Sequence, residues 1–397
     1  MKKVFNAFLA ISMLLGVMLF SSCISDGNDE IVKSYQLTIH LKSDDDLNLN
    51  DASSVCVSWN NDKGQSDSLF ITKDTTVTVV QGMYDFVVSG KVIDEANAYI
   101  SGISNANVFS NSTVTIPLSK VERSTLIFKA IYTTGGKLGY IKDSYFEIVN
   151  NSDEVQYLDG VILSSPTGNQ RSPNAWQSHG ITDLYNSGSG CVVAFPGSGH
   201  DYPLQPGQSV IISNDAVDHS QLAGDGNHCP DLSQAGWEIY LSDINGEIDY
   251  QAPNMDVIFN NNPYMKAFGL GFFGRAYFLA RLPQNLTPKE FASDPKNLQT
   301  IPGVTSNTQY LMIPSKYVLD AVDIWSNSSN THYGTFLPKD DAQGVLASKA
   351  WAGFCVRRKV TKIVNGRDYY QDTNNSANDF LNNQPAKPGY NPTSVDQ

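Results

Sequence analysis

The sequence predicts an all-β protein of two β-sandwiches, the second of which carries long loop insertions. Short runs rich in β-branched and aromatic residues recur along the chain, some with strict apolar–polar alternation, and turn residues separate them. Only 17% of the residues are charged, while Gly, Asn, Ser, Thr and Tyr are plentiful, which is typical of extracellular β proteins with polar loops. The 397 residues suffice for two or three domains. We expect a signal peptide at 1–22, a tether at 23–34, an N-terminal sandwich at 35–120 and a second β domain at 121–391.

The chain begins with the pattern of a secretory signal peptide. Lys2 and Lys3 precede an uncharged stretch at residues 4–20. Residues 20–23, Phe-Ser-Ser-Cys, resemble a bacterial lipobox with Phe where Leu is more usual. This predicts cleavage before Cys23 and acylation of its thiol and its amine, and each buried methylene contributes about 0.8 kcal/mol to membrane anchoring. The alternative is ordinary cleavage that leaves the Cys23 thiol free.

Acidic residues follow the cysteine at once, and the rest of the chain is also acidic. Ser25, Asp26, Asp29 and Glu30 resemble the signal that sends lipoproteins to the outer face of the outer membrane; the alternative is a solvated tether. No second long apolar run appears, so we expect attachment to the outer membrane through the lipid alone. The net charge of −13 repels phosphate backbones and disfavours a nucleic-acid partner.

The predicted N-terminal sandwich starts with a clear strand signal. Residues 35–42 alternate apolar and polar side chains, which indicates a half-buried strand with His40 on its wet face. Further short strands at turn-separated intervals imply a sandwich, and we expect them at 54–59, 69–72, 77–80, 84–88, 98–103 and 113–118. Residues 79–88 resemble the Gly-x-Tyr-x-Phe strand of prealbumin-like modules, so the expected fold is a prealbumin/immunoglobulin-like sandwich.

The second domain carries a more specific resemblance. Strands are predicted at 125–132, 145–150 and 155–163, and Glu147, Asn150, Leu158 and Gly160 match the E-I-x-N and L-x-G pattern of lamin-tail domains. Later segments follow the same pattern in order, at 204–212, 237–249, 354–358, 372–380 and 385–391. The second domain therefore resembles an enlarged lamin-tail-like β-sandwich. The whole chain is similar to a family of Bacteroidota surface lipoproteins, the domain-of-unknown-function family 4876. The resemblance implies a gene near those of TonB-dependent outer-membrane receptors.

Two segments are longer than a minimal lamin-tail domain requires, namely 166–201 and 256–350. We interpret them as long loops on a rigid sandwich, where binding sites usually lie. Within the second one, residues 276–282 read as a strand, and residues 288–292 read as a helical turn capped by Thr287.

The sequence contains no coherent set of catalytic residues. Residues 269–274 fit GxGxxG, but a strand-like aromatic run follows where a dinucleotide site needs a helix, so a glycine-rich bend is the better interpretation. There is neither a GxSxG nor an HExxH motif. We therefore predict a protein without enzymatic activity and without a cofactor.

Three parts of the sequence contain residue types that could bind a metal ion, although none has the spacing of a known metal site. Asp215, Asp218, His219 and His228 gather in one polar loop beside Cys229, and these side-chain types bind transition metals, although an ordinary acidic loop gives the same pattern. The acidic runs at 44–46 and 372–379 offer oxygens for calcium. In the second run, we expect Asp372 and Asp379 to bond backbone amides and fix a turn.

Cysteines and tryptophans leave alternatives open. Besides Cys23 there are Cys56, Cys191, Cys229 and Cys355, and none lies in a CxxC pair. Cys191 and Cys229 are the first pair to test for a disulfide, and buried free thiols are the alternative.

Trp176 and Trp325 lie in the polar insertions, where an exposed ring would contact a ligand or partner. The alternative is that each ring packs against the sandwich and pins its own loop.

These observations support one leading function and two rivals. The leading hypothesis is a cell-surface lipoprotein that binds without catalysis, or serves as an accessory of a TonB-dependent nutrient uptake system. An adhesin or structural surface protein without cargo is the first alternative. The second is a hydrolase whose acids, such as Glu147 or Asp249, meet only in the fold, although we expect Glu147 to bond backbone or an arginine instead.

Overall fold

A computed structural model describes residues 33–43, 47, 49, 52–92, 98–122, 124–167, 171–188, 190–242, 246–327 and 332–396. The predicted signal peptide, lipid attachment at Cys23 and export residues Ser25, Asp26, Asp29 and Glu30 lie outside these ranges, as does the acidic run at 44–46. Strands make up 42% of the structure and helices 8%, so the all-β prediction is confirmed.

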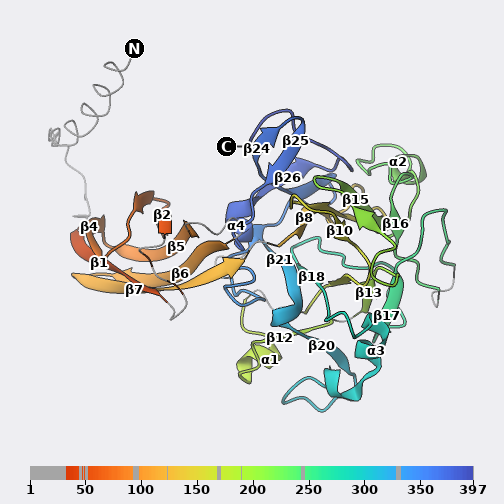
Figure 1. Cartoon of the computed structure of the whole chain (residues 1–397), viewed down its shortest axis with the longest axis horizontal. Coiled ribbons are helices and arrows are strands. Elements are labelled where there is room, and N and C mark those ends of the chain that lie inside the picture. The colour runs from red at the N-terminus through yellow and green to blue at the C-terminus, as the bar shows by residue number, and fades with distance from the viewer. Residues whose placement is uncertain are drawn as a thin grey trace.

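The N-terminal domain is one seven-stranded sheet in the order β3-β2-β5-β6-β7-β1-β4 (Figure 1). Its strands are β1 (Ser34–Ser43), β2 (Ala52–Asn61), β3 (Ser66–Phe70), β4 (Thr75–Val80), β5 (Gly82–Val92), β6 (Ala98–Val108) and β7 (Ser112–Glu122). Neighbours are antiparallel except β1 and β7, which run parallel. Alternate residues of the strands form a single core, which includes Leu37, Val57 and Phe86. As predicted, His40 lies on the wet face, where its ring contacts Asp74.

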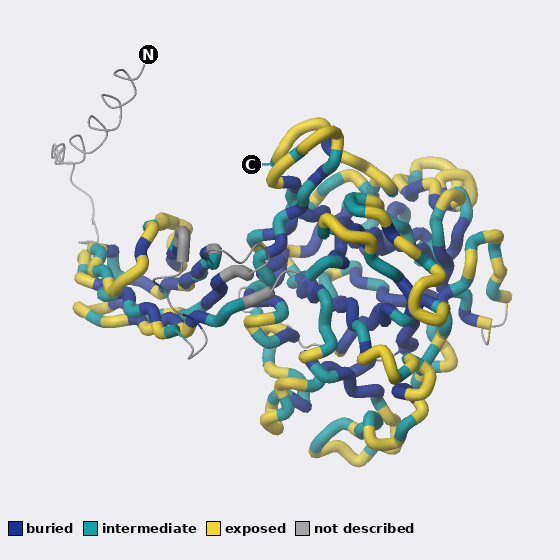
Figure 2. Tube along the Cα trace, viewed as in Figure 1, coloured by how far each residue is buried: buried dark blue, intermediate teal, exposed yellow. Residues whose placement is uncertain are grey.

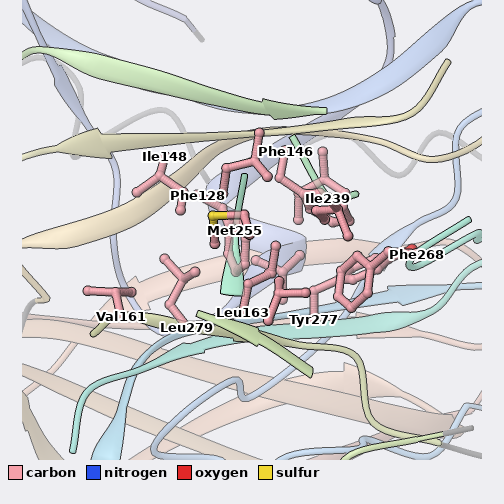
Figure 3. Close-up of a cluster of buried hydrophobic side chains, with 14 of the residues drawn as sticks. Phe128, Phe146, Ile148, Val161, Leu163, Ile239, Met255, Phe268, Tyr277 and Leu279 are labelled. Carbon is pink, nitrogen blue, oxygen red and sulfur yellow. The ribbon is translucent and has the colours of Figure 1, made fainter. Parts of the chain in front are cut away.

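The second domain contains two six-stranded sheets. Sheet I has the order β16-β15-β9-β8-β23-β26, with β16 (Trp237–Glu238), β15 (Ser209–Ser213), β9 (Tyr145–Asn150), β8 (Leu126–Tyr132), β23 (Phe354–Arg358) and β26 (Phe380–Pro385). Sheet II has the order β17-β13-β11-β18-β21-β22, with β17 (Asp256–Asn260), β13 (Cys191–Ala194), β11 (Ile162–Ser164), β18 (Ala276–Ala280), β21 (Val318–Trp325) and β22 (Val345–Leu346). Their side chains meet in the main core, where Phe128 and Phe146 lie with Leu163 and Tyr277 (Figure 3).

A third layer covers the outer face of sheet II. It consists of the small sheet β12 (Leu184–Asn186), β20 (Tyr310–Pro314) and β19 (Leu298–Gln299), together with α3 (Pro288–Ser293). Tyr185, Ile313 and Phe291 from this layer share a core with Phe278 of β18. The predicted Thr287 cap of α3 is confirmed, because its side chain accepts a hydrogen bond from the Glu290 amide.

The interpretation of 166–201 and 256–350 as long loops is therefore wrong. These segments contribute β13, β17, β18, β21 and β22, which are five of the six strands of sheet II. The reason is visible in β18, whose five residues are all buried, because sheet I covers one face and the third layer the other. Such a strand has no apolar–polar alternation to mark it as part of a sheet.

Short elements complete the domain. The hairpin β24 (Val360–Val364) and β25 (Arg367–Tyr370) covers the outer face of sheet I. The remaining elements are β10 (Gln156–Tyr157), β14 (Pro203–Leu204), α1 (Ala175–Ser178), α2 (His219–Leu222), α4 (Ser376–Asp379), and the 3-10 turns η2 (Pro295–Asn297) and η3 (Ser315–Tyr317). Figure 2 shows that exposed residues gather in the loops around a buried interior.

One buried guanidinium joins the two sheets. Arg358 of β23 in sheet I lies 2.6 Å from the Asp320 carboxylate of β21 in sheet II. It also pairs with Asp372 at 3.2 Å and with Asp379 at 3.6 Å. We call these four residues the Arg358 cluster. Asp379 also accepts the Thr373 amide at 2.8 Å, which confirms its predicted role in fixing the turn, whereas Asp372 accepts the amide of Ser124, outside that turn, at 3.3 Å.

The Arg358 cluster should contribute far more to the free energy of unfolding than a surface ion pair does. Replacing Arg358→Gln leaves buried carboxylates without their cation, and we expect the free energy of unfolding to fall by about 3–5 kcal/mol. Arg367→Gln is the matched control, because Arg367 pairs with the exposed Asp153 and should cost no more than about 1 kcal/mol. Urea unfolding of both variants measures the difference, and equal small losses would contradict the role given to Arg358.

Candidate functional site

The second domain contains a cleft of about 430 Å3 where three segments meet. They are the turn after β10, the glycine-rich loop after β13 and the segment that follows β18. We call it the Arg281 cleft, and its lining includes Tyr157, Asp159, Gly197, His200, Arg281 and Leu286. The volume falls within the range of roughly 300–1,000 Å3 that is usual for small-molecule sites.

Asp159 holds the glycine-rich loop in place. Its carboxylate accepts hydrogen bonds from three backbone amides, those of Gly199 at 3.0 Å, Asp201 at 2.8 Å and Tyr202 at 2.9 Å. Burial raises the pKa of Asp159, but these amide bonds outweigh it and leave the pKa below its usual value. Gly197 has a φ of 123°, and a Cβ there would lie 2.2 Å from the Asp159 carboxylate. Only glycine therefore fits, and the loop is fixed before any ligand arrives.

An aromatic pair forms one wall. The Tyr157 and His200 rings meet edge to face, with centroids 4.5 Å apart. Tyr157 is half-buried and sits on β10, which pairs with β14. A tyrosine ring in this position offers an apolar face to a bound ring and a hydroxyl to solvent.

Arg281 supplies the charge of the cleft. It follows β18 directly, its backbone amide bonds the Tyr317 carbonyl at 2.8 Å, and its Nη2 donates to the Tyr157 carbonyl. Burial lowers the pKa of Arg281, and the nearby Asp159 charge opposes that effect. Within the described ranges, no carboxylate forms an ion pair with it. The lining has no second carboxylate beside Asp159, so the arrangement suits binding and lacks the paired acids of a glycosidase.

The predicted contact tryptophans lie elsewhere. Trp176 is only 3% exposed and packs edge to face against Tyr310, with centroids 5.2 Å apart. The expectation of an exposed Trp176 ring is therefore wrong, because the ring pins the α1 loop to β20. Trp325 is half-buried and stacks on His332 at 4.7 Å. Neither lines the Arg281 cleft.

Three of the four predicted metal ligands are committed to other contacts through their side chains, and the fourth, His228, is exposed. His219 is fully buried, and its Nε2 donates to the Asp215 carbonyl at 3.0 Å, so its Nδ1 accepts from the Tyr140 hydroxyl at 2.6 Å. Asp215 pairs with Lys142, and Asp218 caps α2, while the His228 amide bonds the Gly136 carbonyl. Among the described residues, no three His, Cys, Asp or Glu side chains are placed to hold a metal ion. The four residues lie in one region but do not form the predicted site.

The remaining predicted residues have structural surroundings. Glu147 accepts a hydrogen bond from the Gly389 backbone amide at 3.2 Å, which confirms the expected bond to backbone, and it also pairs with Lys129 at 2.8 Å inside sheet I. Asp249 is exposed and accepts from Asn254. Cys56, Cys191, Cys229 and Cys355 are free thiols, and no disulfide joins Cys191 to Cys229.

A buried glutamate escaped the sequence analysis. Glu238 of β16 is fully buried, and its carboxylate accepts the Ala216 amide at 3.0 Å and the Tyr250 amide at 3.3 Å. Burial raises the pKa of Glu238 to about 7, and the nearby charges of Asp215 and Asp249 act in the same direction. Nothing in the local sequence distinguishes it from the exposed acids of the same region.

Comparison with known proteins places part of the chain in a family. Residues 205–387 match the family described as protein of unknown function, DUF4876, which confirms that prediction for these residues. A crystal structure of a DUF4876 family protein from Bacteroides thetaiotaomicron is 28% identical, with a TM-score of 0.58, and the alignment covers 87% of this chain and 94% of that chain. Neither finding tests the lamin-tail resemblance, which stays a prediction.

Two weaker structural similarities carry no argument about this chain. A DUF1812 protein of Bacteroides thetaiotaomicron, named as a candidate polysaccharide-binding protein, is 10% identical over 29% of this chain and 76% of that chain, with a TM-score of 0.18. A candidate cell adhesion protein from Parabacteroides distasonis is 12% identical over 72% of this chain and 90% of that chain, with a TM-score of 0.20. No curated protein matches the chain. In the part of the chain that is described, no helix has the length and apolar character needed to cross a bilayer.

Glu238 should make stability depend on pH. Its pKa in the folded protein, about 7, lies above the ordinary value of 4.5, so its stabilising contribution is complete below pH 4.5 and is lost as the pH rises through 7. We expect the free energy of unfolding to fall between pH 5 and pH 8, and Glu238→Gln to flatten that fall. Denaturant unfolding across this range provides the measurement.

Glu290→Gln is the control for this pH dependence. Glu290 is exposed, and its hydrogen bonds to Thr287 hold its pKa below the usual value. Its contribution to stability is therefore lost only at lower pH, and the slope between pH 5 and pH 8 should persist in this variant. An unchanged slope in Glu238→Gln would contradict the buried, protonated state of Glu238.

Proposed function

Because residues 205–387 match DUF4876 and the fold agrees with a member of that family, we propose that this protein is a cell-surface binding protein without enzymatic activity. Its ligand would bind in the Arg281 cleft. The single observation that carries the proposal is the cleft's construction, in which a preformed loop, an aromatic wall and a guanidinium without an ion-pair partner among the described residues surround one space.

The lining supports binding over catalysis. Hydrolysis of a glycosidic bond needs two carboxylates on either side of the substrate, whereas Asp159 uses both of its oxygens on backbone amides. The lining contains no cysteine. The hydroxyls of its serine and threonine are already engaged, because Ser198 donates to Asp201 and Thr287 donates to Glu290. A fixed loop with unused donors instead lowers the entropy cost of capturing a small molecule.

The location belongs to the same proposal. Acylation of Cys23 would hold the chain at the outer membrane, and the tether would lead into β1 of the N-terminal domain. In the sequence this domain lies between Cys23 and the second domain, so it would act as a spacer that keeps the cleft away from the lipid surface. The finer proposal, an accessory role beside a TonB-dependent nutrient receptor, rests on the family resemblance.

Ligand capture in the cleft can be tested with a matched pair of tyrosines. A panel of saccharides, amino acids and nucleotides is screened for compounds that raise the melting temperature of the soluble protein. We expect Tyr157→Ala to abolish the shift, because it removes the aromatic wall, and Tyr264→Ala to retain it, because Tyr264 is 86% exposed and lies outside the cleft. No stabilising compound, or equal behaviour of the two variants, would count against binding in the cleft.

The anchor and the partner are tested on native membranes. We expect mass spectrometry of the protein to find an acylated Cys23 at the mature N-terminus, and mild detergent extraction to recover it together with an outer-membrane barrel. An unmodified thiol removes the anchor from the proposal. Recovery of the protein alone at every detergent concentration removes the receptor, while the cleft experiment still decides whether the protein binds a ligand.

A further inference from the structure

We infer that the ligand of the Arg281 cleft is a saccharide that carries a carboxylate, with Arg281 bound to that carboxylate and Tyr157 against the sugar ring. The inference rests on the proposed function, because it names the ligand class of the same cleft. Its basis is the contrast between Arg281 and three other arginines of the second domain, whose guanidiniums are paired with aspartates.

Three arginines of this domain pair with aspartates, while Arg275 donates instead to the Ser165 hydroxyl and the Leu270 carbonyl. Arg357 pairs with Asp396 at 2.8 Å, and Arg367 pairs with Asp153 at 2.7 Å. Arg358 is surrounded by three carboxylates. Arg281 is half-buried, and across the described ranges its guanidinium forms a hydrogen bond only with the Tyr157 carbonyl. A guanidinium has five N–H donors, so most of them stay available for a ligand at the cleft.

A carboxylate matches this charge better than a phosphate does. Asp159 is close enough to favour the charged form of Arg281, yet its oxygens are held by backbone amides and it forms no ion pair. One guanidinium without an ion-pair partner among the described residues matches one planar carboxylate, which accepts two parallel N–H bonds. A phosphate carries more charge, and the protein's net charge of −13 opposes every additional negative charge.

The rest of the lining favours a sugar over a peptide. The backbone amides of Gly197 and His200 have no partner among the described residues, and Ser198 and Gln284 add polar side chains. Such closely spaced donors match the hydroxyls of a saccharide. The half-buried Tyr157 ring supplies the flat apolar surface on which a pyranose packs. The cleft also opens to solvent along the exposed loop at 197–200, which leaves room for a chain to continue.

Matched acidic and neutral sugars test the inference. The probes are trigalacturonate, a glucuronate-terminated disaccharide and a sialyl disaccharide, each compared by calorimetry with the same sugar after reduction of its carboxyl to a hydroxymethyl group. We expect at least one acidic sugar to bind and its reduced form to bind about 10- to 100-fold more weakly, as expected for loss of a charged hydrogen-bonded pair. Arg281→Gln should lose the same factor for the acidic sugar and become indifferent to reduction.

Two further variants test whether the preference for acidic sugars comes from the contact between Arg281 and the carboxylate or from the positive charge of the region. Lys289→Gln removes a positive charge from the edge of the region, where Lys289 pairs with Asp256, and should leave the preference unchanged. Arg281→Lys keeps the charge but loses the planar fork, so it should retain part of the preference and also show that position 281 tolerates change. The circular dichroism spectrum of each variant must match that of the native protein.

Each outcome decides the inference separately from the proposed function. Equal binding of acidic and reduced sugars overturns the claim that the ligand needs a carboxylate, while the claim that the cleft binds sugars stands. Binding of none of the six sugars overturns the saccharide, and the thermal-shift screen with Tyr157→Ala then decides whether the cleft binds anything. A preference that survives Arg281→Gln places the carboxylate elsewhere and also overturns the inference.

Discussion

The second domain depends on one buried guanidinium. Arg358 bonds the Phe128 carbonyl of β8 at 2.7 Å and the Asp320 carboxylate of β21 at 2.6 Å, so a single side chain fixes sheet I against sheet II. The Phe128 amide in turn donates a hydrogen bond to the Asp320 carboxylate at 2.7 Å, which closes the connection. Hydrophobic packing holds the sheets together without defining their register, whereas charge-assisted hydrogen bonds at fixed angles do define it. Burial is costly for these groups, and it is tolerated here because every member has partners.

The Arg281 cleft is rigid because two of its segments are joined directly to strands of the second domain. Arg281 is the residue after β18, whose five residues are buried between two layers. Asp159 lies between β10 and β11, so it too is attached to strands that cannot move independently. The loop at 197–200 has no such support from packing, because it is exposed, and Asp159 compensates through its three amide bonds. The cleft is thus made of two strand ends and one loop that is fastened to them.

Local patterns predicted the elements, and the cleft was missed because it has no local pattern. The strand at 35–42, the buried run at 276–282 and the Thr287 cap could all be predicted, since alternation, β-branching and capping are properties of neighbouring residues. The central place of β18 could not be predicted, because a strand covered on both faces resembles any apolar run.

Tyr157, Gly197 and Arg281, which line the cleft, are far apart in the sequence. The paired glycines Gly197 and Gly199 were the one signal that a special backbone lay there. Trp176 misled because polar neighbours suggested exposure, while its ring packs on Tyr310.

The acidity of the chain and the charge of the cleft act at different distances. A net charge of −13 repels anions over the Debye length, about 8 Å at physiological salt, and so slows their approach. Inside the cleft the relevant charge is a guanidinium at contact distance in a partly buried setting, where the interaction is several times stronger than in bulk water. An anion therefore gains only if it places its charge directly on Arg281, and loosely held anions are disfavoured everywhere else on the surface. This combination makes selectivity a consequence of position, and it depends on the absence of an ion-pair partner for Arg281 among the described residues.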